Sequence, residues 1–358
     1  MKPPRIYDPE IEAIAKTLPY FGFSDPKQVR ESLSEMQQML LEQGIERLKD
    51  ENIEEIERSI PGLNGAPDIL IRLYRPKEVT DPMPVFINFH GGGFILGDLE
   101  IDHPRSLIMA ARTKSMGVLV DYRLAPEHPF PAAVEDCYAT LVWVAANAKS
   151  LNVDPNRIVI GGGSAGGTLA AAVALMARDR QGPKILLQML FYPALDERAQ
   201  TASIKQGEGL YICDSHSVRA VWCHYLGITC VQGNLQEKKD LDELNYSGIK
   251  HNESCGHGLS GGDLEDELMH VSPYAAPARA KDVSSLPPVY MMTCEHDALR
   301  DEGILYAMRL MGAGVPVELH HYPGTVHGFD FLTPSRLSEQ AIDDCVLAFM
   351  RACHPKGA

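Results

Sequence analysis

Ser164 is a candidate nucleophile inside a glycine-rich stretch, residues 161–166 (GGGSAG), that lies between an apolar run and an Ala-rich run. The first run predicts a strand and the second predicts a helix. The pattern Gly-x-Gly-x-x-Gly is typical of a loop that cradles a dinucleotide pyrophosphate, whereas Gly-x-Ser-x-Gly is typical of a turn that exposes a nucleophilic serine. Both patterns need a strand, a turn and a helix, so other parts of the chain must separate the two interpretations.

The phosphate-binding interpretations fit the chain poorly. A dinucleotide loop normally lies in the first strand–helix unit and is followed about 20 positions later by an acidic residue that ends a second strand. Here the loop follows at least four predicted strands, and the next acidic residue, Asp179, lies in the predicted helix. A phosphate P-loop needs Lys after its last glycine, and the pair Gly167-Thr168 does not supply it.

The nucleophile interpretation makes demands that the sequence meets. The turn can close only if its flanking positions are small, and these are Gly162 and Gly166. A helix that starts at Ala165 directs N–H groups and its positive dipole end toward a developing oxyanion. A second donor loop is needed upstream, and residues 90–93 (HGGG) directly follow a predicted strand. Gly91, Gly92 and Gly93 leave their backbone N–H groups open to a carbonyl oxygen, and His90 is predicted to brace this loop.

An acid and a histidine must follow the serine in that order, each on a loop after a strand. Asp297 follows a predicted strand that ends near Cys294, and His327 follows one that ends at Tyr322. The candidate set Ser164, Asp297 and His327 therefore lies at the carboxyl ends of strands, where open parallel sheets bind ligands. Other residues compete for these roles, although their positions favour them less: Glu295, Asp301, His296, His320 and His321. His128 is predicted to be structural.

Predicted strands and helices alternate along most of the chain. Residues 1 to about 55 predict two amphipathic helices, which begin near Asp8 and Ser24. Strands are predicted at residues 67–74, 83–89, 118–122, 158–160, 185–190, 288–292 and 315–322, and helices at 104–115, 134–148, 165–180, 304–311 and 338–353. Short, wholly apolar strands that alternate with helices indicate an α/β fold with a mostly parallel sheet, covered on both faces.

Residues 199–271 interrupt this alternation. Residues 214–226 favour a helix, whereas residues 236–270 are polar and rich in Gly, Asp and Glu. Two interpretations stay open for this charged insertion: a solvated surface loop, or a lid or dimer contact that shapes the substrate pocket. The segment also holds Cys and His residues, but they lack the paired spacing of zinc ligands, so no metal site is predicted: Cys213, Cys223, His224, Cys230, Cys255 and His257.

The composition excludes several classes of protein. The 358 residues carry a formal net charge of −15 without a basic run, which disfavours nucleic acid and anionic lipid surfaces as partners. No stretch approaches 18 uninterrupted apolar residues, so no membrane span is predicted. Residues 1–8 lack the apolar core of a secretory signal, and the eight cysteines form no C-x-x-C pair. We therefore expect a cytoplasmic protein whose cysteines are mostly reduced.

Several longer motifs resemble those of hormone-sensitive-lipase-like (bacterial family IV) esterases of the α/β-hydrolase fold. They are HGGGF, DYRLAPEHPFPAAVEDC, GGSAGG, YPALD, SPYAAPARA, EHDALRDEG and YPGTVHGF. The resemblance implies Ser164 as nucleophile, Asp297 and His327 as its partners, and the N–H groups of Gly91, Gly92 and Ala165 as the oxyanion hole. It implies hydrolysis of short- to medium-chain acyl esters without a cofactor or metal. Family members often dimerise, so a homodimer is a candidate assembly.

The resemblance also implies a helical cap over the pocket. The expected organisation is N-terminal cap helices in residues 1–55, a core in 56–198, a cap segment with the charged insertion in 199–271, and the rest of the core in 272–358. One position departs from the family: the residue before the serine is commonly Asp, Glu or Thr, but here it is Gly163. A side chain that could tie the turn to neighbouring loops is therefore missing.

Two alternatives to a carboxylesterase stay open. A deacetylase, lactonase or amidase would use the same three residues, so the sequence does not separate these substrates. A non-catalytic small-ligand receptor on the same scaffold is a different class. Some plant hormone receptors resemble this family but lack the catalytic histidine, and the presence of His327 disfavours that interpretation.

Overall fold

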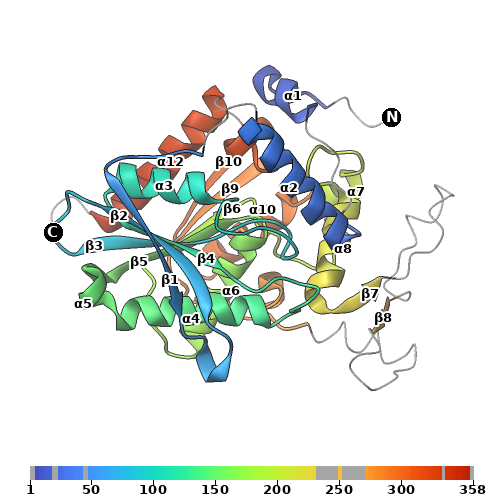
Figure 1. Ribbon diagram of the computed structural model, residues 1–358. Helices are drawn as coiled ribbons and strands as arrows, with labels where there is room; N and C mark the ends of the chain where they lie inside the picture. Colours follow the sequence, from blue (N-terminus) through green and yellow to red (C-terminus); the bar gives the residue numbers. More distant parts are fainter. Residues whose placement is uncertain are drawn as a thin grey trace.

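The computed structural model describes residues 5–17, 23–42, 47–230, 249–251, 271–332 and 335–354. An eight-stranded sheet lies at the centre of this part of the chain, in the order β1-β2-β4-β3-β5-β6-β9-β10 (Figure 1). Strands β1 and β4 pair antiparallel with β2, and the pairs from β4 through β10 are parallel. The strands are β1 (Ile53–Ile60), β2 (Ile69–Pro76), β3 (Met83–Phe89), β4 (Met116–Asp121), β5 (Val153–Gly163), β6 (Leu187–Phe191), β9 (Val289–His296) and β10 (Val317–Val326). The predicted α/β-hydrolase fold with a mostly parallel sheet is confirmed.

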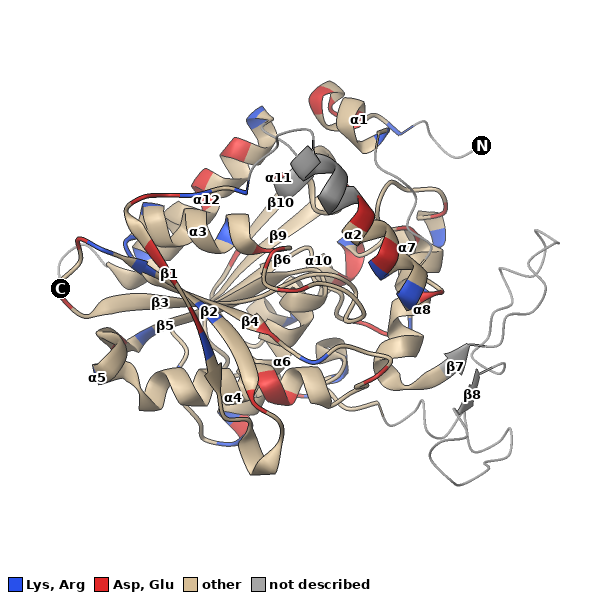
Figure 2. Ribbon diagram, in the orientation of Figure 1, with Lys and Arg blue, Asp and Glu red and all other residues tan. Residues whose placement is uncertain are grey.

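The central strands are buried on both faces because nearly all of their side chains are apolar; Asn88 of β3 and Gln188 of β6 are buried polar exceptions. Strands β3 and β6 contain no Lys, Arg, Asp or Glu and are tan along their length in Figure 2. Phe86 belongs to the hydrophobic cluster on one face of the sheet, and its neighbours Val85 and Ile87 belong to the cluster on the other. Successive strand residues point to opposite faces, so a strand covered on both sides needs apolar side chains at nearly every position.

Helices cover the two faces of the sheet (Figure 1). One face packs against α3 (His103–Thr113) and α12 (Arg336–Cys353), and the other packs against α4 (Ala132–Ala146), α6 (Ala165–Asp179) and α10 (Arg300–Gly312). The remaining helices are shorter or lie beyond the sheet: α1 (Pro9–Ala15), α2 (Pro26–Glu42), α5 (Ala148–Leu151), α7 (Ala202–Gln206), α8 (Ser215–Leu226) and α11 (Phe329–Leu332). No helix in the described ranges is both long and apolar enough to cross a membrane.

The register of the parallel strands brings the candidate residues to one edge of the sheet. Gly162 of β5 lies beside Phe89 of β3 and Leu190 of β6, so all three strands end at the same level. Strands β9 and β10 end in register, with His296 opposite Val326. The segments after β3, β5, β9 and β10 therefore converge, and these are the segments that carry the glycine loop, Ser164, Asp297 and His327.

Strand β1 was not predicted. Its sequence, IEEIERSI, breaks the alternation of apolar and polar residues, and only its two end residues, Ile53 and Ile60, are buried. It is an edge strand that pairs with β2 alone, so charged side chains are tolerated along it. The helices α1, α2 and α8 lie where the sequence predicts them. The charged insertion, residues 236–270, lies outside the described residues apart from the short strand β8 (Ile249–His251), which pairs with β7 (Ile228–Cys230).

Candidate active site

Ser164 lies at the sharp turn between β5 and α6 with a strained backbone. Its φ of 55° and ψ of −120° are unfavourable for a residue with a side chain, at a cost of about 1–3 kcal/mol. The turn is fixed by a 2.9 Å hydrogen bond from the Ser164 N–H to the carbonyl oxygen of Phe191. Among residues 158–170 only Ser164 retains partial exposure, and it lines a cavity. The strained turn therefore exposes Ser164 to the cavity, whereas the neighbouring residues are buried.

Gly162 and Gly166 provide the clearance that this turn needs. A Cβ at Gly162 would lie 2.2 Å from the carbonyl oxygen of Phe89, and a Cβ at Gly166 would lie 1.9 Å from the same atom. Both distances are far inside van der Waals contact, and the obstacle is backbone rather than a movable side chain. Strand β3 thus passes directly against the turn, which only glycine permits at these two positions.

The glycine loop lies next to the serine. Gly91 is adjacent to Gly163 and Ser164, since a Cβ on Gly91 would lie 3.3 Å from the Gly163 oxygen and 3.8 Å from the Ser164 Cβ. Gly92 has a φ of +113° and accepts hydrogen bonds from the N–H groups of Ile95 and Leu96, which close a tight turn. Gly91, Gly92, Gly93 and Ala165 all line the same cavity as Ser164. The glycine loop and the first residue of α6 therefore lie at the same cavity as the serine.

His90 is buried beneath this loop. Its Nδ1 donates a 2.7 Å hydrogen bond to the carbonyl oxygen of Gly91, and its ring stacks on Tyr122 with centroids 4.1 Å apart. The Tyr122 hydroxyl donates in turn to the carbonyl oxygen of His90 at 2.8 Å. Burial lowers the pKa of His90 to about 4. The imidazole is therefore neutral and acts as the brace that the sequence analysis expects.

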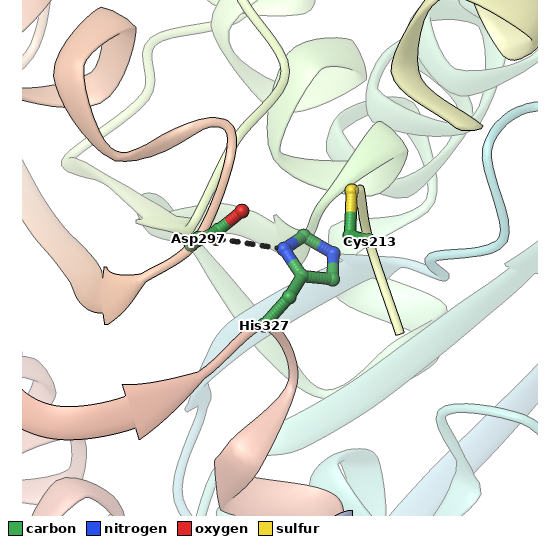
Figure 3. Close-up of side chains that lie close together, drawn as sticks. All are labelled: Cys213, Asp297 and His327. Atoms are coloured by element: carbon green, nitrogen blue, oxygen red, sulfur yellow. Dashed lines mark hydrogen bonds and ion pairs between the residues drawn. The ribbon is translucent and has the colours of Figure 1, made fainter. Parts of the chain in front are cut away.

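Asp297 and His327 are joined by a 2.8 Å hydrogen bond between the Asp297 Oδ2 and the His327 Nδ1 (Figure 3). The second carboxylate oxygen of Asp297 accepts the N–H of Leu299 at 2.9 Å, which fixes the orientation of the carboxylate. Both side chains are buried, and His327 lines the cavity with Ser164.

The competing residues have other partners. Asp301 accepts the N–H of Ser203, and Glu295 accepts the N–H of Gly324. The three competing histidines make contacts away from the cavity: His296 with Ile6, His320 with Glu318 and His321 with Thr293. Within the described residues, His327 is therefore the one of the four candidate histidines that lines the cavity with Ser164, and Asp297 is the candidate acid hydrogen-bonded to it. His128 is exposed.

The cavity has a volume of about 260 Å³ and its walls are mostly apolar. Phe23, Val29 and Leu33 reach it from the N-terminal region, and Val218 and Val221 reach it from α8. Two segments far apart in the sequence thus cover the carboxyl edge of the sheet. A small apolar space above a serine suits an uncharged substrate with short substituents.

Cys213 is a cavity residue that the sequence analysis did not connect with the candidate triad. Its Sγ, a ring nitrogen of His327 and a carboxylate oxygen of Asp297 all lie within 4.8 Å of one another (Figure 3). Burial raises the pKa of the Cys213 thiol well above its usual range, and the nearby Asp297 carboxylate raises it further. The group is therefore a neutral thiol. No sequence spacing signals this contact, because Cys213 reaches the site on the segment before α8.

The middle-segment cysteines and histidines do not gather in the described part of the chain. Cys213 lies against His327, whereas Cys230, Cys255 and His257 have side chains outside the described residues. Cys137, Cys213, Cys294, Cys345 and Cys353 are free thiols, as the sequence analysis expects, but Cys223 is disulfide-bonded.

Comparisons with known proteins show which family the chain belongs to. Residues 86–237 and 262–331 match the family model described as alpha/beta hydrolase fold. The chain is 36% identical to carboxylesterase NlhH of Mycobacterium tuberculosis over 300 residues, which are 84% of this chain and 83% of that protein. It is 33% identical to an arylesterase of Saccharolobus solfataricus over 73% of each chain. The solved structure of a bacterial heroin esterase aligns with a TM-score of 0.83 and 36% identity over 98% of both chains.

Proposed function

The chain belongs to the hormone-sensitive-lipase-like esterases of the alpha/beta hydrolase fold, and from this premise we propose that it is a serine carboxylesterase for short- to medium-chain acyl esters. One observation carries the proposal. Ser164 on its strained turn and His327, oriented by the 2.8 Å hydrogen bond to Asp297, line the same cavity. A nucleophile, a base and a group that orients the base are the parts that acyl transfer needs.

The proposed reaction begins when His327 removes the proton of Ser164 as its oxygen attacks the ester carbonyl. Asp297 holds the imidazole tautomer and stabilises the imidazolium that forms. The N–H groups of Gly91, Gly92 and Ala165 stabilise the oxyanion of the tetrahedral intermediate. His327 then protonates the leaving alcohol, and water hydrolyses the acyl-enzyme with His327 again as base. Apart from the substrate and the water, every group that takes part in this proposed reaction belongs to the chain itself.

The cavity supports short, uncharged acyl and alcohol groups. Its volume of about 260 Å³ lies below the roughly 300–1,000 Å³ that is typical of drug-sized ligands. An anionic substituent would lose its hydration against Phe23, Val29 and Val221, and the Asp102 carboxyl group in the cavity lining would not attract it. We expect acetate and butyrate esters of p-nitrophenol to react faster than the laurate ester.

Replacement of the nucleophile tests the proposal. Ser164→Ala should lower kcat on p-nitrophenyl butyrate by at least about 10⁴-fold, because the covalent step is lost while the fold is kept. A fluorophosphonate should add its phosphonyl mass to the wild-type protein and not to Ser164→Ala. Wild-type hydrolysis by a correctly folded Ser164→Ala protein would show that the assignment is wrong.

Cys213 requires a matched control, because a thiol beside a His–Asp pair is itself the arrangement of a cysteine nucleophile. The raised pKa of Cys213 argues against that role, since the thiolate is the reactive form. Cys213→Ala should therefore keep most of the hydrolysis and all of the fluorophosphonate labelling. If Cys213→Ala loses activity and Ser164→Ala keeps it, the nucleophile is the thiol.

The alternatives differ from the proposal in substrate or in chemistry. A deacetylase, lactonase or amidase would share the triad, so a panel of acetylated sugars, lactones and anilides beside the ester series distinguishes them. A non-catalytic receptor would not react with a fluorophosphonate. A homodimer and a cytoplasmic location stay predictions from the sequence, to be measured by light scattering of the purified protein and by cell fractionation.

A further inference from the structure

The space beside Gly163 is occupied by two side chains from other parts of the chain. A Cβ at Gly163 would lie 3.1 Å from the Cε2 of Tyr192, 3.2 Å from its hydroxyl oxygen and 3.4 Å from an Nη of Arg105. The space of the side chain that is missing just before the nucleophile is thus filled by a phenol from the residue after β6 and by a guanidinium from α3.

These two groups form a buried network with Asp330, and the Asp102 Oδ1 lies 3.7 Å from the Arg105 Nε beside it. The Tyr192 hydroxyl accepts a 2.9 Å hydrogen bond from Arg105 and donates a 2.8 Å hydrogen bond to the Asp330 Oδ1. The same Arg105 nitrogen lies 3.1 Å from the Asp330 Oδ2. The charged side chains are only 6% and 3% exposed, so solvent screens their attraction very little. We call Arg105, Tyr192 and Asp330 the elbow clamp.

The elbow clamp touches each chain segment that carries a candidate catalytic group. Asp330 follows His327 by three residues, and the Tyr192 ring meets the His327 ring edge to face with centroids 4.8 Å apart. The Tyr192 N–H donates to Met292 of β9, the strand that leads to Asp297. The residue before Tyr192, Phe191, accepts the N–H of Ser164. The Tyr192 side chain therefore lies between the Ser164 turn, strand β9 and the loop that carries His327.

We infer that the elbow clamp positions His327 against Ser164, with Asp330 supplying the carboxylate tie that position 163 lacks. This inference rests on the proposed function. Tyr192, Arg105 and Asp330 are positioning residues, because they act through the His327 loop and the Ser164 turn and not on the ester. Burial and the Asp330 carboxylate raise the pKa of Tyr192 well above its usual range, so its hydroxyl remains a donor.

Tyr192→Phe is the first test, because it removes only the hydroxyl and keeps the ring against His327. We expect kcat on p-nitrophenyl butyrate to fall about 10-fold, with KM nearly unchanged, since misplacing reacting groups slows chemistry more than binding. The rate is to be expressed per active site titrated with the fluorophosphonate. A merely structural role would reduce the number of titrated sites and leave kcat per site at the wild-type value, which would overturn the inference.

The second test moves the carboxylate from position 330 to position 163. Gly163→Asp in the wild-type background places a second carboxylate against Asp330 and should lower kcat per site. In the Asp330→Asn background the same Gly163→Asp change supplies the missing acceptor to Tyr192 and Arg105, and it should raise kcat per site. Gly163→Asn has the same size without the charge and measures the steric cost, because a Cβ at position 163 would already lie 3.1 Å from the Tyr192 ring. Equal kcat per site for Gly163→Asp and Gly163→Asn in the Asp330→Asn background would contradict the carboxylate role.

The outcomes separate this inference from the proposed function. If the wild-type protein is not labelled by the fluorophosphonate, or Ser164→Ala still hydrolyses the ester, the proposed function fails. If labelling and the loss of activity in Ser164→Ala are as expected but Tyr192→Phe keeps full kcat per site, only the elbow clamp fails. If Asp330→Asn does not fold, Tyr192→Phe alone decides, since it leaves both charges of the buried pair in place.

Discussion

At the scale of single residues, His90 connects the stability of the protein to pH. The imidazole is buried, and burial lowers its pKa to about 4, whereas an unfolded histidine titrates near 6.5. Below pH 6.5 the unfolded chain takes up a proton that the folded chain does not accept. The stability that is present above pH 6.5 is therefore lost as the pH falls toward 4, and the loss amounts to roughly 3 kcal/mol.

We expect His90→Gln to reduce this dependence on pH. The free energy of unfolding of the wild-type protein should fall steeply between pH 6.5 and 4, and the fall should be smaller by roughly 3 kcal/mol in the variant. Urea unfolding at pH 7, 5.5 and 4 measures the difference. His128→Gln, at an exposed position, is the matched control and should behave as the wild type. An unchanged slope in His90→Gln would mean that His90 does not set the acid sensitivity.

At the scale of elements, the strands and site loops that could be predicted from the sequence are those that a local residue pattern or the order of motifs determines. Strand β3 has the predicted bounds, Met83–Phe89, and Asp297 and His327 follow their strands as expected. Strand β1 was missed because the edge of a sheet tolerates a broken alternation. The elbow clamp was missed because its members lie 87 and 138 residues apart, and no local spacing encodes such contacts. The absence of a side chain at Gly163 was the local feature that left room for Tyr192 and Arg105 beside the serine turn.

Arg30 of helix α2 makes hydrogen bonds to the segments that follow strands β3 and β4. Its guanidinium donates to the carbonyl oxygen of Ile95 at 2.6 Å and to that of Ala125 at 2.8 Å, and it pairs with Glu127 at 2.7 Å. The neighbouring residues Val29 and Leu33 line the cavity. Hydrogen bonds to charged groups contribute about 1.5–3 kcal/mol each, so Arg30 is a principal attachment of this cavity wall.

Arg30→Gln should loosen α2 and so weaken substrate binding. We expect KM for p-nitrophenyl butyrate to rise several-fold while kcat changes little, since the catalytic groups lie on other elements. Lys27→Gln is the control, because Lys27 lies on the same helix, is 87% exposed and has its partner Glu31 3.9 Å away. Equal KM values for the two variants would show that α2 does not need this attachment to form the cavity.

At the scale of the whole molecule, the N-terminal segment packs against the two loops that carry Asp297 and His327. The Asp8 N–H donates to the carbonyl oxygen of Gly324, three residues before His327. The Ile6 carbonyl accepts a hydrogen bond from His296, which directly precedes Asp297. Helix α1 then buries Ile11 against the core cluster on that face, with 1% of the residue exposed. Residues near the start of the chain therefore help to fix loops that lie about 300 positions further along.

Ile11→Ala tests this long-range support in the intact chain. Removing a buried isoleucine side chain costs about 2–5 kcal/mol, which should lower the melting temperature by several degrees. Because the loss falls beside the catalytic loops, inactivation on heating should also quicken, while kcat at 25 °C stays near the wild-type value. Glu12→Gln, which breaks only an exposed pair with Lys16 on the same helix, should change neither property. If Ile11→Ala melts at a lower temperature but loses activity on heating at the same rate as the wild-type protein, helix α1 stabilises the fold without supporting the loops.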